Sequence, residues 1–321
     1  MKAWICKGYG GPEVLALEDR PVPVPGDDEV LVKIHATTVA SGDVRVRAFK
    51  LPHGFGLIGR LVLGITRPRQ PIMGTEMAGT VAAIGKHVKA FKIGDAVMAF
   101  AGAAMRCHAQ YRVMSVKQAI ALKPDNLSLD EAASLPFGAM TALHFLRKAQ
   151  LKADEKILVI GASGAVGSAF VQLANHMGAE VTGVTSGRNV SLVRSLGAKA
   201  VVDYTVEDFT QAPQTYDIIA DTVGASGFAA CRAKLNEHGR YISVAGGLSD
   251  ILARPSGTKK SIGGPASERA NDFRELARLA ESGALKPVID RTYSFLQIPE
   301  AHAYVETGRK RGSVVVSMSH D

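Results

Sequence analysis

Cysteine is scarce in this sequence, with three among 321 residues: Cys6, Cys107 and Cys231. They lie far apart and form no CxxC pair, which argues against a disulfide framework and against a cysteine-rich zinc site. We therefore expect a protein of a reducing compartment, the cytoplasm.

Long apolar runs are also missing. The most apolar stretch, residues 54–65 (GFGLIGRLVLGI), is too short to span a membrane and carries Arg60 in its middle. It is either a pocket wall or lid, or a surface helix packed on the core. The opening MKAWICKGYGGPEVL lacks the features of a signal sequence. We expect neither a membrane span nor secretion.

Aromatic residues make up 6% of the chain, and the net charge of +8 comes from short groups of basic residues rather than a long run. These groups are Arg67/Arg69, Lys259/Lys260 and residues 309–311. A nucleic-acid surface needs a concentrated basic face, commonly interleaved with aromatics. We interpret the charge as a solvated surface and expect no nucleic-acid partner.

The patterns that are present indicate two domains of the α/β class. Residues 30–39 (VLVKIHATTV) alternate like a half-buried strand, whereas helix formers begin near Asp130 and then alternate with short apolar strands. That alternation predicts a doubly wound parallel Rossmann sheet. After Pro287 the chain returns to strand-like runs. We expect a β-rich domain at 1–125, completed by 290–321, and a Rossmann domain at 126–289.

One motif indicates the chemistry. Residues 157–167 read ILVIGASGAVG and run directly into a helical segment, which is the strand, glycine-rich turn and helix that bind a dinucleotide pyrophosphate. Gly164 would let the backbone approach the phosphates, and Gly167 would let the helix pack on the strand. The alternative is a turn selected only for its backbone angles. The predicted cofactor residues here are Ser163, Gly164, Ala165, Val166 and Gly167.

The end of the second strand predicts NADPH rather than NADH. An NAD site usually has an acidic residue there, but this chain has Thr185, followed by Ser186 and Arg188. Small donors and a cation favour a 2′-phosphate. In the alternative interpretation Arg188 is a solvated residue of the next helix.

The order of these parts resembles the medium-chain dehydrogenase/reductase superfamily over nearly the whole chain. The resemblance is carried by GPEVL, GTEMAGTVAAIGKHVKAFKIGDAV, AASLPFGAMTALHFL, GASGAVG, SLGAKAVVDY, LKPVIDRTYSF and AHAYVETGRKRGSVVV. It implies a GroES-like β-rich domain beside the Rossmann domain.

Two positions distinguish this chain from the zinc alcohol dehydrogenases of that superfamily. Ala40 stands where they carry a cysteine, and Thr75 stands where they carry the histidine of GHE. The LPFGAMTA segment offers no third cysteine, and only Cys107 remains of a four-cysteine lobe. We expect no metal. The chain is similar to the zinc-independent quinone oxidoreductases, zeta-crystallin-like proteins and enone reductases.

That resemblance implies hydride transfer from NADPH to a quinone, enone or alkenal, and the longer apolar loop at residues 54–71 suggests a bulky lipophilic acceptor. It places Tyr204 beside the 2′-phosphate, Asp43 and Thr141 at the interdomain cleft, and Ala245 and Gly246 on the nicotinamide side. We assign no catalytic acid or base, since His53, His108 and His144 are interpreted as packing or surface residues. The alternatives are an alcohol dehydrogenase acting on a primary or aromatic alcohol, and a non-enzymatic NADPH-binding protein.

The run KKSIGG at residues 259–264 predicts an edge strand that could pair with its copy across a two-fold axis. We therefore expect a homodimer.

Overall fold

The computed structural model describes residues 1–318 and divides them into two compact units. Unit 1 comprises Met1–Leu51, Leu57–Phe137 and the chain from Glu268 on, and unit 2 comprises Pro52–Gly56 and Gly138–Ser267. The sequence expectation placed 126–137 and 268–289 in the Rossmann domain. The structure assigns them to unit 1, where the amide of Asn126 donates to the Ala280 carbonyl at 3.0 Å.

Unit 1 is built on an antiparallel sheet. The strands follow the order β14-β15-β3-β4-β5-β7 across the sheet. On the edge of β3 that faces away from β4, β15 pairs with the end of β3 and β6 pairs with its first half. Only the β14–β15 pair is parallel. β1 and β2 form a separate antiparallel pair. The strands are β1 Lys2–Cys6, β2 Leu15–Asp19, β3 Glu29–Thr38, β4 Glu76–Ile84, β5 Ala96–Phe100, β6 Tyr111–Ser115, β7 Ala119–Leu122, β14 Ile289–Ser294 and β15 Ser313–Ser317.

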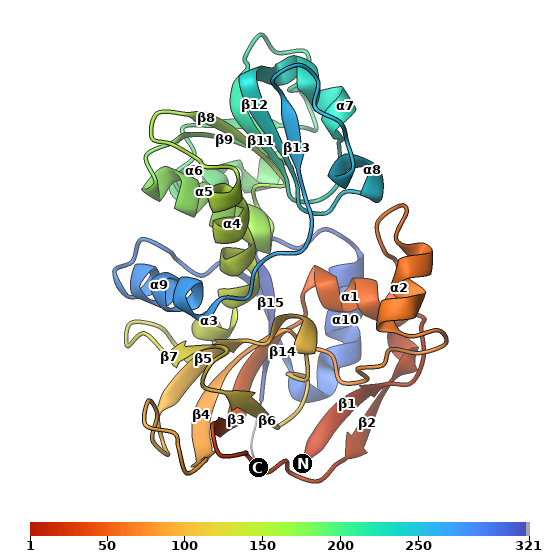
Figure 1. The fold of residues 1–321 in the computed structure, drawn as a ribbon, viewed down its shortest axis with the longest axis vertical. Helices are drawn as coiled ribbons and strands as arrows, with labels where there is room; N and C mark the ends of the chain where they lie inside the picture. Colours follow the sequence, from red (N-terminus) through yellow and green to blue (C-terminus); the bar gives the residue numbers. More distant parts are fainter. Residues whose placement is uncertain (319–321) are drawn as a thin grey trace. The chain divides into compact units, whose positions relative to one another are not determined.

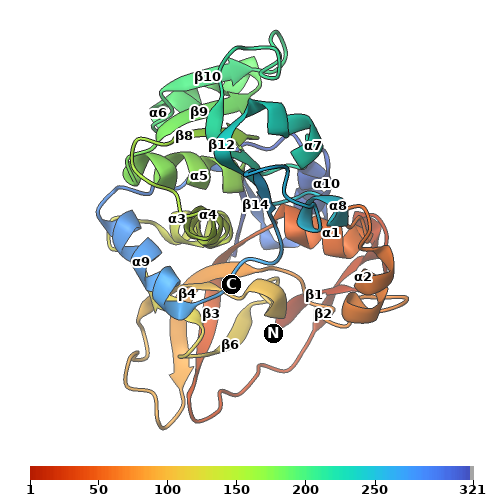
Figure 2. The same ribbon diagram turned by 45° about the horizontal axis from the view of Figure 1, so that its top comes forward.

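The hydrophobic core of unit 1 contains strands from both the N-terminal and the C-terminal part of the chain. The alternating residues of β3 bury Val30, Val32 and Ile34 completely, and Val314 and Val316 of β15 belong to the same cluster. The helices of this unit are α1 Ser41–Ala48, α2 Gly56–Leu63, α3 Leu129–Ala133, α9 Ala270–Glu281 and α10 Ile298–Glu306. α9 contacts the edge strand β7, and Figure 2 shows α9 (blue) alongside this sheet, of which β3, β4 and β6 are labelled.

Unit 2 contains the predicted Rossmann sheet. Six parallel strands run in the order β10-β9-β8-β11-β12-β13, the doubly wound order that reverses direction between β8 and β11. The strands are β8 Lys156–Ile160, β9 Glu180–Thr185, β10 Ala200–Asp203, β11 Tyr216–Asp221, β12 Leu235–Ser243 and β13 Lys260–Ile262. The expected edge strand at 259–264 is confirmed as β13.

Helices flank this sheet on two sides, with α5 and α6 on one and α7 and α8 on the other (Figure 1). They are α4 Pro136–Lys148, α5 Ala165–His176, α6 Val190–Ser195, α7 Phe228–Cys231 and α8 Leu248–Ile251. β8 is buried after its first residue, which is why its sequence is a continuous apolar run. Within residues 1–318 no helix is long and apolar enough to cross a membrane.

Candidate cofactor-binding site

The glycine turn between β8 and α5 has the geometry that a dinucleotide requires. Gly161 adopts φ +80°, and a Cβ on Gly167 would lie 2.0 Å from the Gly161 carbonyl oxygen, so only glycine permits this helix–turn packing. A Cβ on Gly164 would lie 3.5 Å from that oxygen, which is ordinary contact. The fold therefore requires glycine at 167 but not at 164.

The start of α5 fits an anion. Gly164 is the N-cap residue, and no side chain caps the helix. The backbone N–H groups of the first turn, from Ala165 and Val166 onward, have no partner within a helix and lie at the positive end of its dipole. Gly164, Ala165 and Val166 are half-buried. These residues fit a pyrophosphate, as the sequence predicts.

Ser163 contributes to the site through its side chain, which bonds to neighbouring protein residues. Its hydroxyl accepts hydrogen bonds from Thr185 Oγ1 at 2.9 Å and from Asn189 Nδ2 at 3.1 Å, and all three side chains are buried. Asn189 Nδ2 also lies 3.3 Å from Ser186 Oγ. The predicted cofactor residue Ser163 thus ties the glycine turn to the end of β9 with its side chain.

The three residues predicted for the 2′-phosphate come together at one corner of unit 2. Asp203, the last residue of β10, pairs with Thr185 at the end of β9, and the Tyr204 backbone N–H donates to the Thr185 carbonyl at 3.1 Å. Arg188 lies in the short turn Gly187–Asn189 and is exposed, as is Tyr204. Ser186 precedes that turn.

Asp203 adds a negative charge to this corner, which sequence reasoning missed. Its carboxylate accepts hydrogen bonds from the Thr205 hydroxyl at 2.7 Å and from the Thr205 backbone N–H at 3.0 Å, and these bonds lower its pKa. A Cβ on Gly187 would lie 2.4 Å from Asp203 Oδ2. The prediction considered only the end of β9, whereas this acid arrives from the neighbouring strand.

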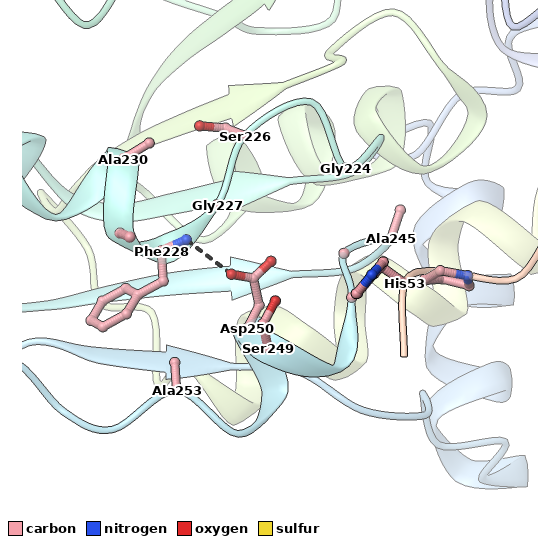
Figure 3. Close-up of a pocket in the computed structure, with 14 residues that line it drawn as sticks. His53, Gly224, Ser226, Gly227, Phe228, Ala230, Ala245, Ser249, Asp250 and Ala253 are labelled. Carbon is pink, nitrogen blue, oxygen red and sulfur yellow. Dashed lines mark hydrogen bonds between the residues drawn. The ribbon is translucent and has the colours of Figure 1, made fainter. Parts of the chain in front are cut away.

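A cavity of about 630 Å³ opens at the ends of β11 and β12 (Figure 3). Ala245 and Gly246, predicted on the nicotinamide side, both line it. The volume lies within the range of small-molecule sites. The other lining residues are Pro52, His53, Gly224, Ser226, Gly227, Phe228, Ala229, Ala230, Gly247, Ser249, Asp250 and Ala253.

Asp221 shapes one wall of this cavity and was not singled out from the sequence. Its buried carboxylate accepts four backbone N–H groups, of residues 223–226, at 2.7 to 3.3 Å. The Tyr241 hydroxyl donates to the same carboxylate at 3.2 Å. An aspartate at a strand end, just before Thr222-Val223-Gly224, is the signal that could have identified this turn.

Asp250 and His53 form the opposite side of the cavity. The Asp250 carboxylate accepts from the Phe228 backbone N–H at 3.1 Å, the bond drawn in Figure 3, and from the Ser243 hydroxyl at 3.4 Å. The Leu248 backbone N–H donates to the His53 carbonyl at 2.9 Å, and this bond holds the segment Pro52–Gly56 against the start of α8. His53, interpreted from the sequence as packing or surface, is an exposed residue that lines the cavity.

Asp43 and Thr141, predicted at a cleft, lie in different units. Asp43 is fully buried in unit 1, and its carboxylate accepts the backbone N–H groups of Ala40 at 2.8 Å and Gly74 at 2.9 Å. Burial raises its pKa. These contacts give Asp43 a structural role, joining the start of α1 to the segment before β4.

Thr141 lies one helical turn after Gly138 in α4. A Cβ on Gly138 would lie 2.3 Å from the Ala165 carbonyl oxygen, so α4 packs directly on the start of α5. Thr141 itself is buried. The structure therefore places it near the glycine turn, within unit 2.

Glu76 stands in the GTE segment that the sequence comparison with zinc enzymes singled out. It is buried, and it accepts hydrogen bonds from the Thr38 hydroxyl and, at 2.6 Å, from the Phe137 backbone N–H in the first turn of α4. Burial raises the pKa of Glu76 to about 7. The neighbouring Thr75 hydroxyl is buried without a hydrogen-bond partner. In residues 1–318 no three His, Cys, Asp or Glu side chains lie where they could hold a metal ion.

The parallel sheet, the glycine turn and the adjoining cavity define a dinucleotide-binding α/β protein. Two family models match the chain: "Alcohol dehydrogenase GroES-like domain" over residues 26–142 and "Zinc-binding dehydrogenase" over residues 196–316. The chain belongs to the medium-chain dehydrogenase/reductase superfamily, and the predicted fold, family and oxidoreductase class are confirmed.

Individual relatives align over nearly the whole chain. The 2-methylene-furan-3-one reductase of Solanum lycopersicum is 34% identical, over 98% of this chain and 79% of the relative. The chloroplastic NADPH-dependent alkenal/one oxidoreductase of Arabidopsis thaliana is 31% identical with the same coverage. Among solved structures, the quinone oxidoreductase from Coxiella burnetii superposes with a TM-score of 0.87 at 29% identity, over 99% of both chains.

Proposed function

We propose that the protein reduces a quinone, enone or alkenal with NADPH and without zinc. The observation that carries this proposal is the glycine turn at the start of α5, with Ser186, Arg188 and Tyr204 gathered at the ends of β9 and β10. The names of the relatives support the acceptor class, since they are reductases of conjugated carbonyls and quinones.

The chemistry of such acceptors suits the residues at the zinc positions. A bound nicotinamide supplies a hydride, and a conjugated acceptor takes it at carbon and spreads the resulting charge, so that no metal needs to polarise the carbonyl. Ala40 offers no ligand atom and Thr75 offers only a hydroxyl, which is a poor zinc ligand. We propose that Ala245 and Gly246 line the side of the site where the nicotinamide lies.

The test is NADPH oxidation by the purified chain with a cyclic enone, an alkenal and a benzoquinone, before and after dialysis against a chelator. We expect turnover with at least one acceptor that the chelator leaves unchanged. Activity lost on chelation and restored by zinc would favour an alcohol dehydrogenase. Tight NADPH binding without turnover on any acceptor would favour a non-enzymatic NADPH-binding protein.

The cofactor preference rests on Arg188 and can be tested by substitution. Arg188→Ala removes a charge-assisted contact to the 2′-phosphate, so we expect NADPH to bind about tenfold or more weakly while NADH binding is unchanged. Arg194→Ala, an exposed arginine in α6, is the matched control because it removes the same charge from the same region. Fluorescence titration of both cofactors measures the ratio. Equal weakening by the two variants would show that Arg188 acts only through net charge.

We further propose a cytoplasmic homodimer formed through β13. This strand lies at the edge of the parallel sheet, where its outer hydrogen-bonding groups can pair with a second copy. Light scattering of the pure chain measures the mass, and a monomer at micromolar concentration would contradict the proposal.

A further inference from the structure

Helix α2 exposes its large apolar side chains, while its single polar side chain, Arg60, is partly buried. Its one charged residue, Arg60, turns toward unit 1, where its guanidinium carbon lies 3.9 Å from the centre of the Phe49 ring and 4.9 Å from that of Tyr9. Arg60 also donates to the Ile65 carbonyl, and the Tyr9 hydroxyl donates to the Gly64 carbonyl at 2.8 Å. The two rings lie side by side, with centroids 4.8 Å apart, and the guanidinium lies over both of them. This cation–π contact is stabilising, so it fixes which face of α2 points outward.

The outward face consists of large apolar side chains. Leu57, Ile58, Leu61, Val62 and Ile65 are each between 49% and 78% exposed. Helical spacing places Leu57, Ile58, Leu61 and Val62 on one side of α2, where they form a patch, and Ile65 follows in the turn after Gly64. Gly59, on the inner side, is buried, and a Cβ there would lie 2.1 Å from Leu51 Cδ1. A soluble helix normally has the reverse arrangement, and an exposed apolar patch of this kind marks an interaction surface.

The stretch of sequence that carries this patch is basic, although buried Arg47 and exposed Lys50 both pair with Glu306. Residues 44–75 contain six Lys and Arg residues and no Asp or Glu. Arg67 and Arg69 directly follow the helix and are exposed, and the Arg69 N–H donates to the Leu63 carbonyl at 2.7 Å, which holds this turn against the end of α2. Lys50 is exposed too, although it pairs with Glu306 at 2.7 Å.

We propose that α2 and the turn 64–69 bind the surface of a lipid bilayer that carries anionic headgroups. The apolar side chains of α2 insert at the boundary between headgroups and acyl chains, and Arg67 and Arg69 contact the lipid phosphates. The helix lies in the plane of the interface. Figure 1 shows α2 (orange) at the margin of unit 1, beside α1.

The charge favours this occupant over a second copy of the chain. A two-fold contact through α2 would bring together two copies of the same basic segment without supplying a negative charge to either, which opposes association. An anionic bilayer instead offers both the apolar medium and the opposite charge. The bilayer proposal rests on residues of unit 1 and is independent of the proposed acceptor and cofactor.

The experiment is co-sedimentation of the full chain with phosphatidylcholine vesicles, with and without phosphatidylglycerol. We expect binding to the anionic vesicles that is at least about tenfold stronger than to the neutral ones and that falls as salt rises from about 0.05 M to about 0.5 M. Leu57→Asp/Leu61→Asp and Arg67→Glu/Arg69→Glu should each lower the partition coefficient about tenfold or more. Leu252→Asp is the matched control, since Leu252 is an equally exposed leucine of unit 2.

Three results would overturn the proposal. One is the absence of sedimentation with anionic vesicles at low salt. Another is equal loss of binding in Leu252→Asp, which would assign the binding to the net charge of +8 and the general surface. The third is a dimer mass by light scattering that becomes a monomer mass in Leu57→Asp/Leu61→Asp, because the patch would then be covered by a second copy. Thermal unfolding of each variant confirms that the exposed substitutions leave the chain folded.

Discussion

Gly164→Ala should leave unit 2 folded and weaken NADPH binding about tenfold or more, whereas Gly167→Ala should destabilise the unit by about 3 kcal/mol. At Gly167 the added methyl would meet the Gly161 carbonyl oxygen at 2.0 Å, and backbone cannot yield there without moving α5. At Gly164 the methyl has room within the protein, at 3.5 Å from the same atom. It would instead stand between the backbone and the pyrophosphate.

The two variants separate fold from cofactor. Hydrogen exchange of peptides covering β8 and α5 reports on the fold of the turn, and NADPH fluorescence titration reports on binding. Loss of a glycine N-cap in favour of alanine costs under about 1 kcal/mol, so Gly164→Ala should show near-native protection. If Gly164→Ala binds NADPH as tightly as the unmodified chain, the phosphates do not approach this residue and the cofactor site lies elsewhere.

Glu76→Gln should remove a pH dependence of stability from unit 1. In the folded chain burial raises the pKa of Glu76 from its ordinary 4.5 to about 7, so the folded state binds a proton that the unfolded state has released over this pH range. The stability that Glu76 contributes is therefore fully present below pH 4.5 and decreases as pH rises to about 7, above which the loss is complete. At about 1.4 kcal/mol for each pH unit, the loss amounts to about 3 kcal/mol.

The measurement is urea unfolding between pH 4.5 and 8, followed by tryptophan fluorescence. Trp4 is the only tryptophan of the chain and is buried in the core of unit 1, so its emission reports on this unit. Other groups also titrate: burial lowers the pKa of His302, which removes stability as pH falls. Such contributions are common to both proteins and cancel in the difference between Glu76→Gln and the unmodified chain.

Glu300→Gln, at an exposed carboxyl of unit 1, is the control and should follow the unmodified chain at every pH. A Glu76→Gln curve parallel to that of the unmodified chain would show that Glu76 is ionised in the folded state. The glutamine can still accept one of the two hydrogen bonds, from Phe137 N–H, so the start of α4 should remain in place.

The parts of the fold that sequence patterns predicted are local ones. The apolar run of β8, the glycine turn and the buried start of α5 lie within about twenty residues, and their order determines their structure. The same holds for the edge strand β13 and the returning strands β14 and β15. Domain boundaries were less well predicted, because α9 and the segment 126–137 are assigned by packing against unit 1.

The sequence pattern singled out the candidate residues of the continuous glycine motif. It missed residues that reach the same region from other strands. Asp203 comes to the corner that holds Ser186 and Arg188 because β10 pairs with β9, and Asp221 organises the cavity wall through four backbone N–H groups. Asp43 is buried and accepts two backbone N–H groups, and its place in the cofactor site stays a prediction.

The sequence by itself determined the class of the protein: a Rossmann unit with a glycine turn, a β-rich unit, and an oxidoreductase family. It could do so because side-chain periodicity and turn chemistry act between residues close in the chain. The tertiary structure decided which charges meet, that Arg60 turns onto the rings of Tyr9 and Phe49, and that the apolar face of α2 is exposed. Those outcomes depend on contacts between residues distant in sequence, whose burial and electrostatic free energies are set only once the chain has folded.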